Sequence, residues 1–191
     1  MNGTDVNSEV IKMEQIPTQI STGAASPTRS SELAELNLSL ELKSAEEIIA
    51  EAYKRSDKVM TSTTFGHQSA AILHMVTKVI PDATILWVDT GYNTPATYRF
   101  ADQLIERLDL NVEIYAPRMT STRRNVLMGG IPEVDDPLHD EFTRQVKLEP
   151  FERATRHLSS EIWITGVRRE QTEFRQTLQV ASTTNAGILK L

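Results

Sequence analysis

The residues in this chain that are best suited to chemistry form a cationic group near its carboxyl end. The sequence there reads Gly166-Val167-Arg168-Arg169-Glu170-Gln171, and Arg175 follows four residues later. Guanidinium groups bind phosphate and sulfate oxygens through paired hydrogen bonds. An exposed helix with Arg–Glu pairs is the alternative interpretation. The anion site is favoured because the group directly follows an apolar segment typical of a buried strand. Its candidate binding residues are Arg168, Arg169, Gln171 and Arg175.

A second group is rich in small polar residues and reads Thr64-Phe65-Gly66-His67-Gln68-Ser69. It joins a segment that favours a strand to one that favours a helix. Backbone N–H groups at such a turn, together with the positive end of the helix, suit a phosphate or pyrophosphate. Gly66 would permit close approach of the ligand, and Thr64 and Ser69 would offer hydroxyl groups. The alternative is an ordinary turn with a Ser or Thr N-cap. It is not a Walker loop, since no Gly-Lys-Ser/Thr follows.

A third group reads Asp89-Thr90-Gly91-Tyr92 and precedes Pro95. An aspartate at the carboxyl end of a strand can accept a hydrogen bond from a ribose hydroxyl or an adenine amino group. In the alternative interpretation Asp89 caps the turn and Gly91 supplies a positive φ. The candidate nucleotide contacts of this group are Asp89, Thr90 and Gly91.

Lys147 opens a fourth group, Lys147-Leu148-Glu149-Pro150. Proline suits the first turn of a helix, because its missing N–H leaves no donor unsatisfied there. Lys147 would then lie beside the entrance of that helix, where its charge could bind an anion. A solvated surface lysine is the alternative.

Apolar spacing indicates the elements that position these groups. A continuous apolar run predicts a strand over 84–88, and strands are also predicted over 59–63, 112–115 and 162–165. Residues 187–191 have the composition of a further strand. Helical spacing predicts helices over 69–80, 95–108 and 146–158, and a capping box from Ser44 to Glu47 predicts one over 44–55. This alternation predicts an α/β fold with a doubly wound, mostly parallel sheet and helices on both faces. Ligands of such sheets bind beyond the carboxyl ends of the strands, where all four groups fall.

Composition divides the chain into a turn-rich tail over 1–30, expected to be disordered, a helical segment over 31–57 and a nucleotide-binding domain over 58–191. The net charge is −6, of which −5 lies in residues 1–57, so the larger segment lacks the basic face that nucleic acids require. The chain has no cysteine, and its four histidines have no metal-ligand spacing, so no metal is expected. No apolar run could span a membrane and no signal peptide is evident, which favours the cytoplasm.

In their order and spacing the four groups resemble the phosphoadenosine phosphosulfate (PAPS) reductase family, whose fold is that of PP-loop, adenine nucleotide alpha hydrolase-like proteins. The resemblance covers about residues 59–191. It implies that the first loop faces the phosphosulfate, that the Asp-Thr-Gly turn lines the adenosine side, and that Lys147 and the arginines neutralise the anionic groups. It adds Gln68 to the candidate contacts, a residue typical of the branch that uses PAPS. The implied ligands are PAPS and adenosine 3′,5′-bisphosphate. The implied reductant is thioredoxin or glutaredoxin, and the family commonly forms homodimers.

Two departures from the family pattern affect this interpretation. Relatives that use adenosine phosphosulfate bind an iron–sulfur cluster through paired cysteines, and Phe142-Thr143 occupy those places here, so no cluster is expected. The family's nucleophilic cysteine, which lies in a C-terminal tail, is also absent. Because a thiolate is required for this sulfur transfer, the chain is expected to be C-terminally truncated and inactive alone. No residue of the chain is therefore assigned as catalytic.

Two other functions stay open at this point. One is an ATP-using nucleotidyl transferase of the PP-loop type, similar to the small subunit of sulfate adenylyltransferase, although Phe65 and Gln68 stand where that pattern has Gly and Asp. The other is a non-catalytic nucleotide-binding module that docks a basic partner through its acidic N-terminal segment.

Overall fold

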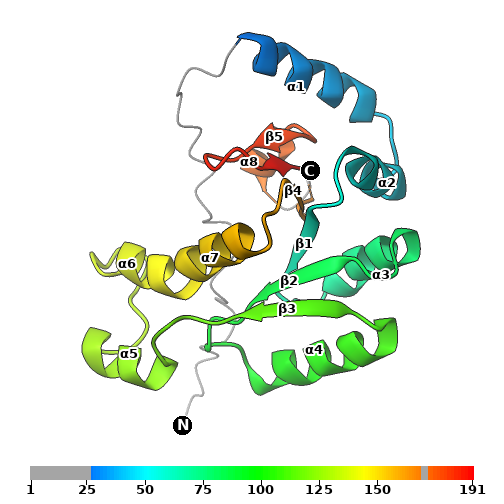
Figure 1. The fold of residues 1–191 in the computed structure, drawn as a ribbon. Coiled ribbons are helices and arrows are strands. Elements are labelled where there is room, and N and C mark those ends of the chain that lie inside the picture. Colours follow the sequence, from blue (N-terminus) through cyan, green and yellow to red (C-terminus); the bar gives the residue numbers. More distant parts are fainter. Residues whose placement is uncertain (1–26, 169–171) are drawn as a thin grey trace.

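One sheet of six strands organises the molecule (Figure 1). The computed structural model describes residues 27–168 and 172–191. The strands lie in the order β3-β2-β1-β4-β6-β5. Their bounds are Val59–Thr63 for β1, Thr84–Val88 for β2, Asn111–Tyr115 for β3, Ile162–Ile164 for β4, Ser182–Thr183 for β5 and Leu189–Lys190 for β6. All neighbours pair in parallel except β5 and β6, which are antiparallel, so the predicted mostly parallel sheet is confirmed.

Helices connect the strands. Their bounds are Pro27–Leu40 for α1, Ala45–Arg55 for α2, Ser69–Val79 for α3, Pro95–Leu108 for α4, Ser121–Met128 for α5, His139–Thr143 for α6, Glu149–His157 for α7 and Glu173–Gln176 for α8, with a π-helical segment, η2, over Arg144–Leu148. The capping box predicted at Ser44 and Glu47 is present and starts α2. Thr94 caps α4 in the same way, and Pro95 occupies its first position.

Helices cover both faces of the sheet, as expected for a doubly wound fold (Figure 1). The larger core cluster joins α1 to α4 with one face of the sheet and includes Leu73, Ile85 and Ile164. The smaller cluster lies on the opposite face, where Phe151 and Ala154 of α7 pack among residues of β1, β2 and β4. Burial on both faces explains the continuous apolar run of β2, whereas β1 also buries the hydroxyl residues Thr61, Ser62 and Thr63.

The strand order places a topological switch point between β1 and β4. From β1 the chain proceeds outward through β2 to β3, and it then returns to place β4 on the other side of β1. The loops that leave β1 and β4 therefore follow the carboxyl ends of two neighbouring strands at the switch point. In open α/β sheets this is where ligands bind.

The structure corrects one predicted element and adds others. The helix predicted over 146–158 begins seven residues earlier, since α6, η2 and α7 follow one another without a break from His139 to His157. Pro150 lies in the first turn of α7, as predicted, but that turn continues η2 without a break. The π segment accommodates Pro150: the N–H of Glu149 donates to the carbonyl of Arg144, five residues earlier. Helices α5 and α8 and strand β5 were not predicted.

The N-terminal helices are joined to the same core. Leu36, Leu40 and Ile49 belong to the larger cluster. The side chain of Asn37 accepts from the N–H of Ala181 at 2.8 Å and donates to the carbonyl of the same residue at 2.9 Å. Helix α1 starts at Pro27, inside the tail predicted over 1–30, and the rest of that tail lies outside the described residues.

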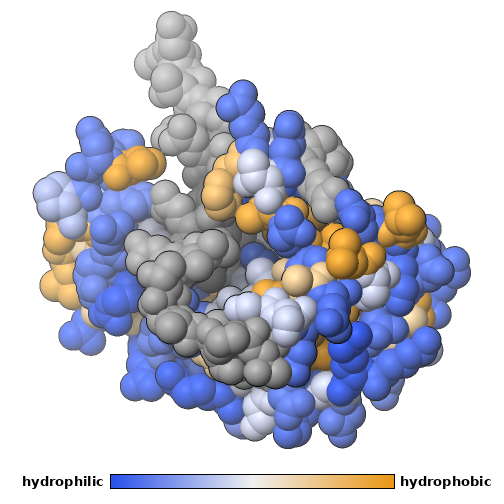
Figure 2. Space-filling view, turned by 90° about the horizontal axis from the view of Figure 1, so that it is seen from above, coloured by the Kyte–Doolittle hydropathy of each residue, from blue (hydrophilic) through white to orange (hydrophobic). Residues whose placement is uncertain are grey.

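The exterior is largely polar. Figure 2 shows a mainly hydrophilic face on which apolar residues form small separate groups. Within the described ranges, no helix is both long enough and apolar enough to cross a bilayer.

Candidate anion and nucleotide site

The loop after β1 carries strained backbone at Phe65. Phe65 has a φ of 51°, in the left-handed region that glycine usually occupies. Its N–H donates to Oγ1 of Thr63 at 3.1 Å, and its buried ring contacts that of Trp87 edge-on, at 4.9 Å between centroids. Packing and this hydrogen bond hold the strain in place. Strained residues held in this way cluster at functional sites.

The amides that follow Phe65 point to an anion site. Gly66, His67 and Gln68 are exposed, and among the hydrogen bonds of the described residues none uses their N–H groups. The N-cap of α3 is Gln68, whose side chain makes no capping bond. The alternative of a Ser or Thr N-cap is therefore wrong. Ser69 opens the helix and donates its N–H to the carbonyl of Gly66 at 2.8 Å, and Thr64 is half-buried before the turn.

The turn after β2 is held by its own aspartate. Oδ1 of Asp89 accepts from the N–H of Gly91 at 3.0 Å, from Nδ2 of Asn93 at 3.0 Å and from the hydroxyl of Tyr98 at 2.8 Å. Gly91 has a φ of +78°. Oγ1 of Thr90 accepts a hydrogen bond from the N–H of Tyr92. The turn-capping role is thus real. A nucleotide that contacts Asp89 would therefore bind a carboxylate that already accepts these three hydrogen bonds.

Lys147 is buried within η2, with 3% of its surface exposed. The alternative of a solvated lysine is therefore wrong. A lysine is rarely buried unless its charge is compensated. Helix α7 ends just before the amino end of β4. The start of α7, with Lys147 in the preceding η2, therefore lies toward the carboxyl ends of the strands. Short π segments of this kind occur frequently at functional sites.

The segment after β4 lies against the start of α3. A Cβ built on Gly166 would lie 3.4 Å from Cγ2 of Ile72, in the first turn of that helix. Arg168, two residues further on, is half-buried. Arg175 is half-buried in α8, near enough to lower the pKa of Lys190, whose burial is the larger cause of that shift. The predicted contacts Arg169 and Gln171 lie outside the described residues.

The loops therefore converge by topology on the switch point between β1 and β4. The first loop and the segment after β4 flank it, and the contact between Gly166 and Ile72 joins them directly. The Asp89 turn follows β2, one strand further along the same edge.

Two contributing residues were not singled out as contacts from the sequence. Tyr98 orients Asp89 from the first turn of α4. Burial, the hydrogen bond to Asp89 and the charge of Asp89 together raise its pKa to about 12. Arg124 in α5 is buried and places its guanidinium 6.0 Å from the centre of the Tyr92 ring. A spacing of nine residues from Asp89 could have suggested Tyr98, but no sequence signal distinguishes Arg124 from the adjacent Arg123.

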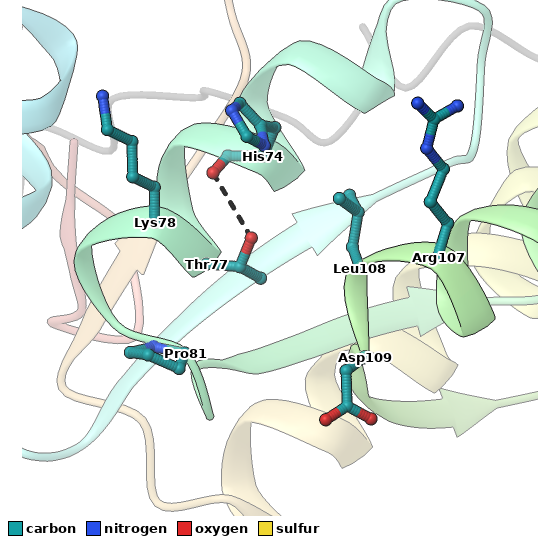
Figure 3. Close-up of a pocket in the computed structure, with 7 residues that line it drawn as sticks. All are labelled: His74, Thr77, Lys78, Pro81, Arg107, Leu108 and Asp109. Atoms are coloured by element: carbon teal, nitrogen blue, oxygen red, sulfur yellow. Dashed lines mark hydrogen bonds between the residues drawn. The ribbon is translucent and has the colours of Figure 1, made fainter.

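A cavity of about 410 Å³ lies away from these loops (Figure 3). Residues of the last turns of α3 and α4 line it, among them Lys78, Arg107 and Asp109, together with Pro81, which precedes β2. It therefore lies at the amino ends of the strands. Basic residues at helix C-termini favour the helix dipole, which accounts for the cations here without a ligand.

Phe142 and Thr143, which the family resemblance places where some relatives have cluster-binding cysteines, are buried in packing contacts. Phe142 is fully buried and contacts the Tyr92 ring at 5.2 Å between centroids, and Thr143 is buried beside it. Over residues 27–168 and 172–191, no group of three or more His, Asp or Glu side chains is placed to hold a metal ion.

The fold is that of a PP-loop-type α/β domain. The sequence model of the phosphoadenosine phosphosulfate reductase domain matches residues 58–190, and the chain belongs to that family. Phosphoadenosine 5′-phosphosulfate reductases from Synechococcus sp. and Synechocystis sp. are 39% and 37% identical to it, each over 78% of its length. A solved PAPS reductase from Candida auris, in a phosphate complex, has a TM-score of 0.71 at 24% identity and covers 84% of this chain and 77% of its own, which shows the shared fold.

The chain spans only part of the curated relatives that it matches. The alignments cover 65% of the Synechococcus protein and 60% of the Synechocystis protein.

Proposed function

We propose that this chain is the nucleotide-binding part of a PAPS reductase and binds PAPS and adenosine 3′,5′-bisphosphate. The nucleotide would lie in a crevice at the switch point between β1 and β4, as ligands of open α/β sheets do. The observation that supports this is the contact of Gly166, in the segment after β4, with Ile72 of α3, the helix that follows the exposed amides of residues 66–68. Family membership supports the choice of nucleotide.

Each group has a distinct role in this proposal. The amides of Gly66 and Gln68, with Thr64 and Ser69, hold the phosphosulfate at the N-terminus of α3. Asp89, Thr90 and Gly91 face the adenosine. Four cationic or amide side chains neutralise or bind the anionic groups, namely Lys147, Arg168, Arg169 and Gln171, and Arg175 adds a further charge.

The reaction would also need a thiol, which this chain does not contain. A thiolate attacks the sulfur of PAPS, the bond from sulfur to the bridging oxygen breaks, and adenosine 3′,5′-bisphosphate leaves with the electron pair. A dithiol such as reduced thioredoxin or glutaredoxin then releases sulfite and becomes the disulfide. We expect binding without turnover when the chain is supplied alone. A cytoplasmic location fits this chemistry, because dithiols are kept reduced there.

Titration calorimetry with adenosine 3′,5′-bisphosphate tests the proposal. Arg168→Gln should weaken binding about tenfold, the value of one charge-assisted hydrogen bond pair. The matched control is Arg156→Gln, since Arg156 is exposed at the far end of α7. Gly66→Ala is a second test: its Cβ would meet only Oγ1 of Thr64, at 3.6 Å, so the fold has room for it and a bound phosphate does not.

Two results would contradict the proposal. One is a folded protein that gives no heat with the bisphosphate. The other is equal affinity in Arg168→Gln and Arg156→Gln. Binding of ATP with magnesium and release of pyrophosphate would favour the nucleotidyl transferase instead.

A further inference from the structure

A second cationic cavity lies between α5 and the start of α7. Its volume is about 210 Å³, and its lining consists of Arg118, Met119, Arg124, Arg144, Gln145 and Glu149. Three of these six residues are arginines, and one is a carboxylate. None of them belongs to the nucleotide contacts proposed above.

Arg124 is the central residue of this cavity, and only 1% of its surface is exposed. Its Nε donates to Oε1 of Gln145 at 3.1 Å, and its Nη2 donates to the carbonyl of Met119 at 2.9 Å. The remaining nitrogen, Nη1, is buried and has no acceptor among the described residues. An arginine stays charged in proteins, so a buried donor without an acceptor is destabilising.

The charge of Arg124 is not balanced by a direct ion pair. None of the ion pairs among the described residues includes it. Gln145 links Arg124 to Glu141 indirectly: its Oε1 accepts from Arg124, and its Nε2 donates to the Glu141 carboxylate at 2.7 Å. Glu141 itself pairs with Arg144 at 2.6 Å.

The second carboxylate near the cavity is also occupied. Glu149 accepts from Nε of Arg118 at 3.1 Å and from Nε of Arg153 at 3.0 Å. These two hydrogen bonds and the charge of both arginines hold its pKa below the ordinary value, although partial burial opposes the shift. Four arginines thus face three carboxylates, because the charge of Glu152 also acts on Arg144, and the excess is one positive charge.

We propose that the cavity at Arg124 binds a tetrahedral oxyanion, sulfate or phosphate, at a site separate from the crevice between β1 and β4. Such an anion would offset the excess positive charge and accept a hydrogen bond from Nη1 of Arg124. Arg118 and Arg144 at the rim have 80% and 57% of their side chains exposed, so they can move to admit it. The source of the oxyanion is either the free ion or a phosphate of the bound nucleotide, because Tyr92 connects Arg124 to the Asp89 turn.

Titration of sodium sulfate into the whole chain, at constant ionic strength against chloride, tests the site. Low millimolar concentrations avoid the general stabilisation that sulfate gives to any folded protein. The wild type should bind at two sites, the crevice and the cavity. Arg124→Gln should weaken the cavity site about tenfold or more. The matched control is Arg123→Gln, because Arg123 is exposed on the same helix.

Two further variants keep the test decisive. If Arg124→Gln does not fold, as judged by circular dichroism, Arg144→Gln at the exposed rim should still weaken the site about threefold through its lost charge. Gly66→Ala should remove the crevice site and leave the cavity site intact. Sulfate isotherms of Arg124→Gln and Arg144→Gln that match the wild type would overturn the proposal.

Nucleotides separate the two sources of the oxyanion. If the cavity takes a phosphate of the nucleotide, Arg124→Gln should lose the preference for adenosine 3′,5′-bisphosphate over adenosine 5′-monophosphate. If it takes the free ion, that preference is unchanged, and sulfate still binds to protein saturated with the bisphosphate. Should the bisphosphate fail to bind while sulfate binding still depends on Arg124, the proposed function fails and the oxyanion site stands.

Discussion

The hydroxyl of Tyr98, in the first turn of α4, donates to Oδ1 of Asp89, which directly follows β2, at 2.8 Å. The same oxygen accepts from the amide of Gly91 and from Asn93. Tyr98 of α4 thus holds in place the carboxylate of Asp89, which in turn organises the loop before α4. The candidate adenosine side of the site is therefore preorganised in the absence of a ligand.

Tyr98→Phe tests this relationship through the pH dependence of stability. The pKa of Tyr98 is raised to about 12, so between pH 10 and 12 the folded chain keeps a proton that the unfolded chain loses. The free energy of unfolding should accordingly fall as the pH rises through this window. The variant should flatten the fall, and it should also lose about 1 kcal/mol of stability at neutral pH with the hydrogen bond.

Urea unfolding at about pH 9 and about pH 11 measures both effects. Tyr53→Phe serves as the comparison, because burial, with a smaller effect of Asp82, raises the pKa of Tyr53 to about 12 as well. Tyr53→Phe should also reduce the fall in the free energy of unfolding at alkaline pH, by an amount separate from that of Tyr98→Phe. An unchanged slope in Tyr98→Phe would contradict the role assigned to this hydroxyl.

Gly91→Ala should destabilise the Asp89 turn by about 1 kcal/mol, because a φ of +78° is unfavourable for alanine. Gly66→Ala is the contrasting variant, since Gly66 does not need a positive φ, and it should leave the melting temperature unchanged. Thermal unfolding of the two variants side by side tests the difference. Equal melting temperatures would show that the turn adapts without strain.

Thr63→Val should disturb the strained loop at Phe65. The substitution keeps the shape of the side chain and removes Oγ1, the acceptor of the Phe65 amide. The cost should be about 1 to 2 kcal/mol, since both groups are buried. Because the same loop presents the Gly66 amide, affinity for the bisphosphate should fall as well. Titration calorimetry on folded Thr63→Val measures this affinity. An unchanged affinity would show that Thr63 has a purely structural role.

Asn37→Ala should show that the N-terminal helices are integral to the fold. It removes both hydrogen bonds to the backbone of Ala181 and should cost about 2 kcal/mol. Leu38→Ala is the matched control, because Leu38 is 75% exposed and its loss should change little. Denaturant midpoints compare the two. A single shared transition is expected, and an early separate transition for α1 would argue against a common core.

The sequence determined the central strands and the helices with strong apolar spacing. The strands at 59–63 and 84–88 and helix α4 coincide with their predicted bounds. A strand buried on both faces can leave a continuous apolar run, as β2 does, and α4 has apolar residues at helical spacing. Four groups of polar residues could also be assigned to the carboxyl ends of elements from their order alone.

Tertiary structure decided the features that local spacing does not encode. Pro150 indicated the first turn of a helix and lies in the first turn of α7, yet that turn continues a longer helix whose π segment accommodates the missing N–H and buries Lys147. Nothing near Arg124 in the sequence marks it as buried, because burial there results from contacts with Tyr92 and Gln145, more than twenty residues away on either side. Strand pairing likewise places the loop after β1 beside the segment after β4, and only the order of strands in the sheet could bring those distant residues together.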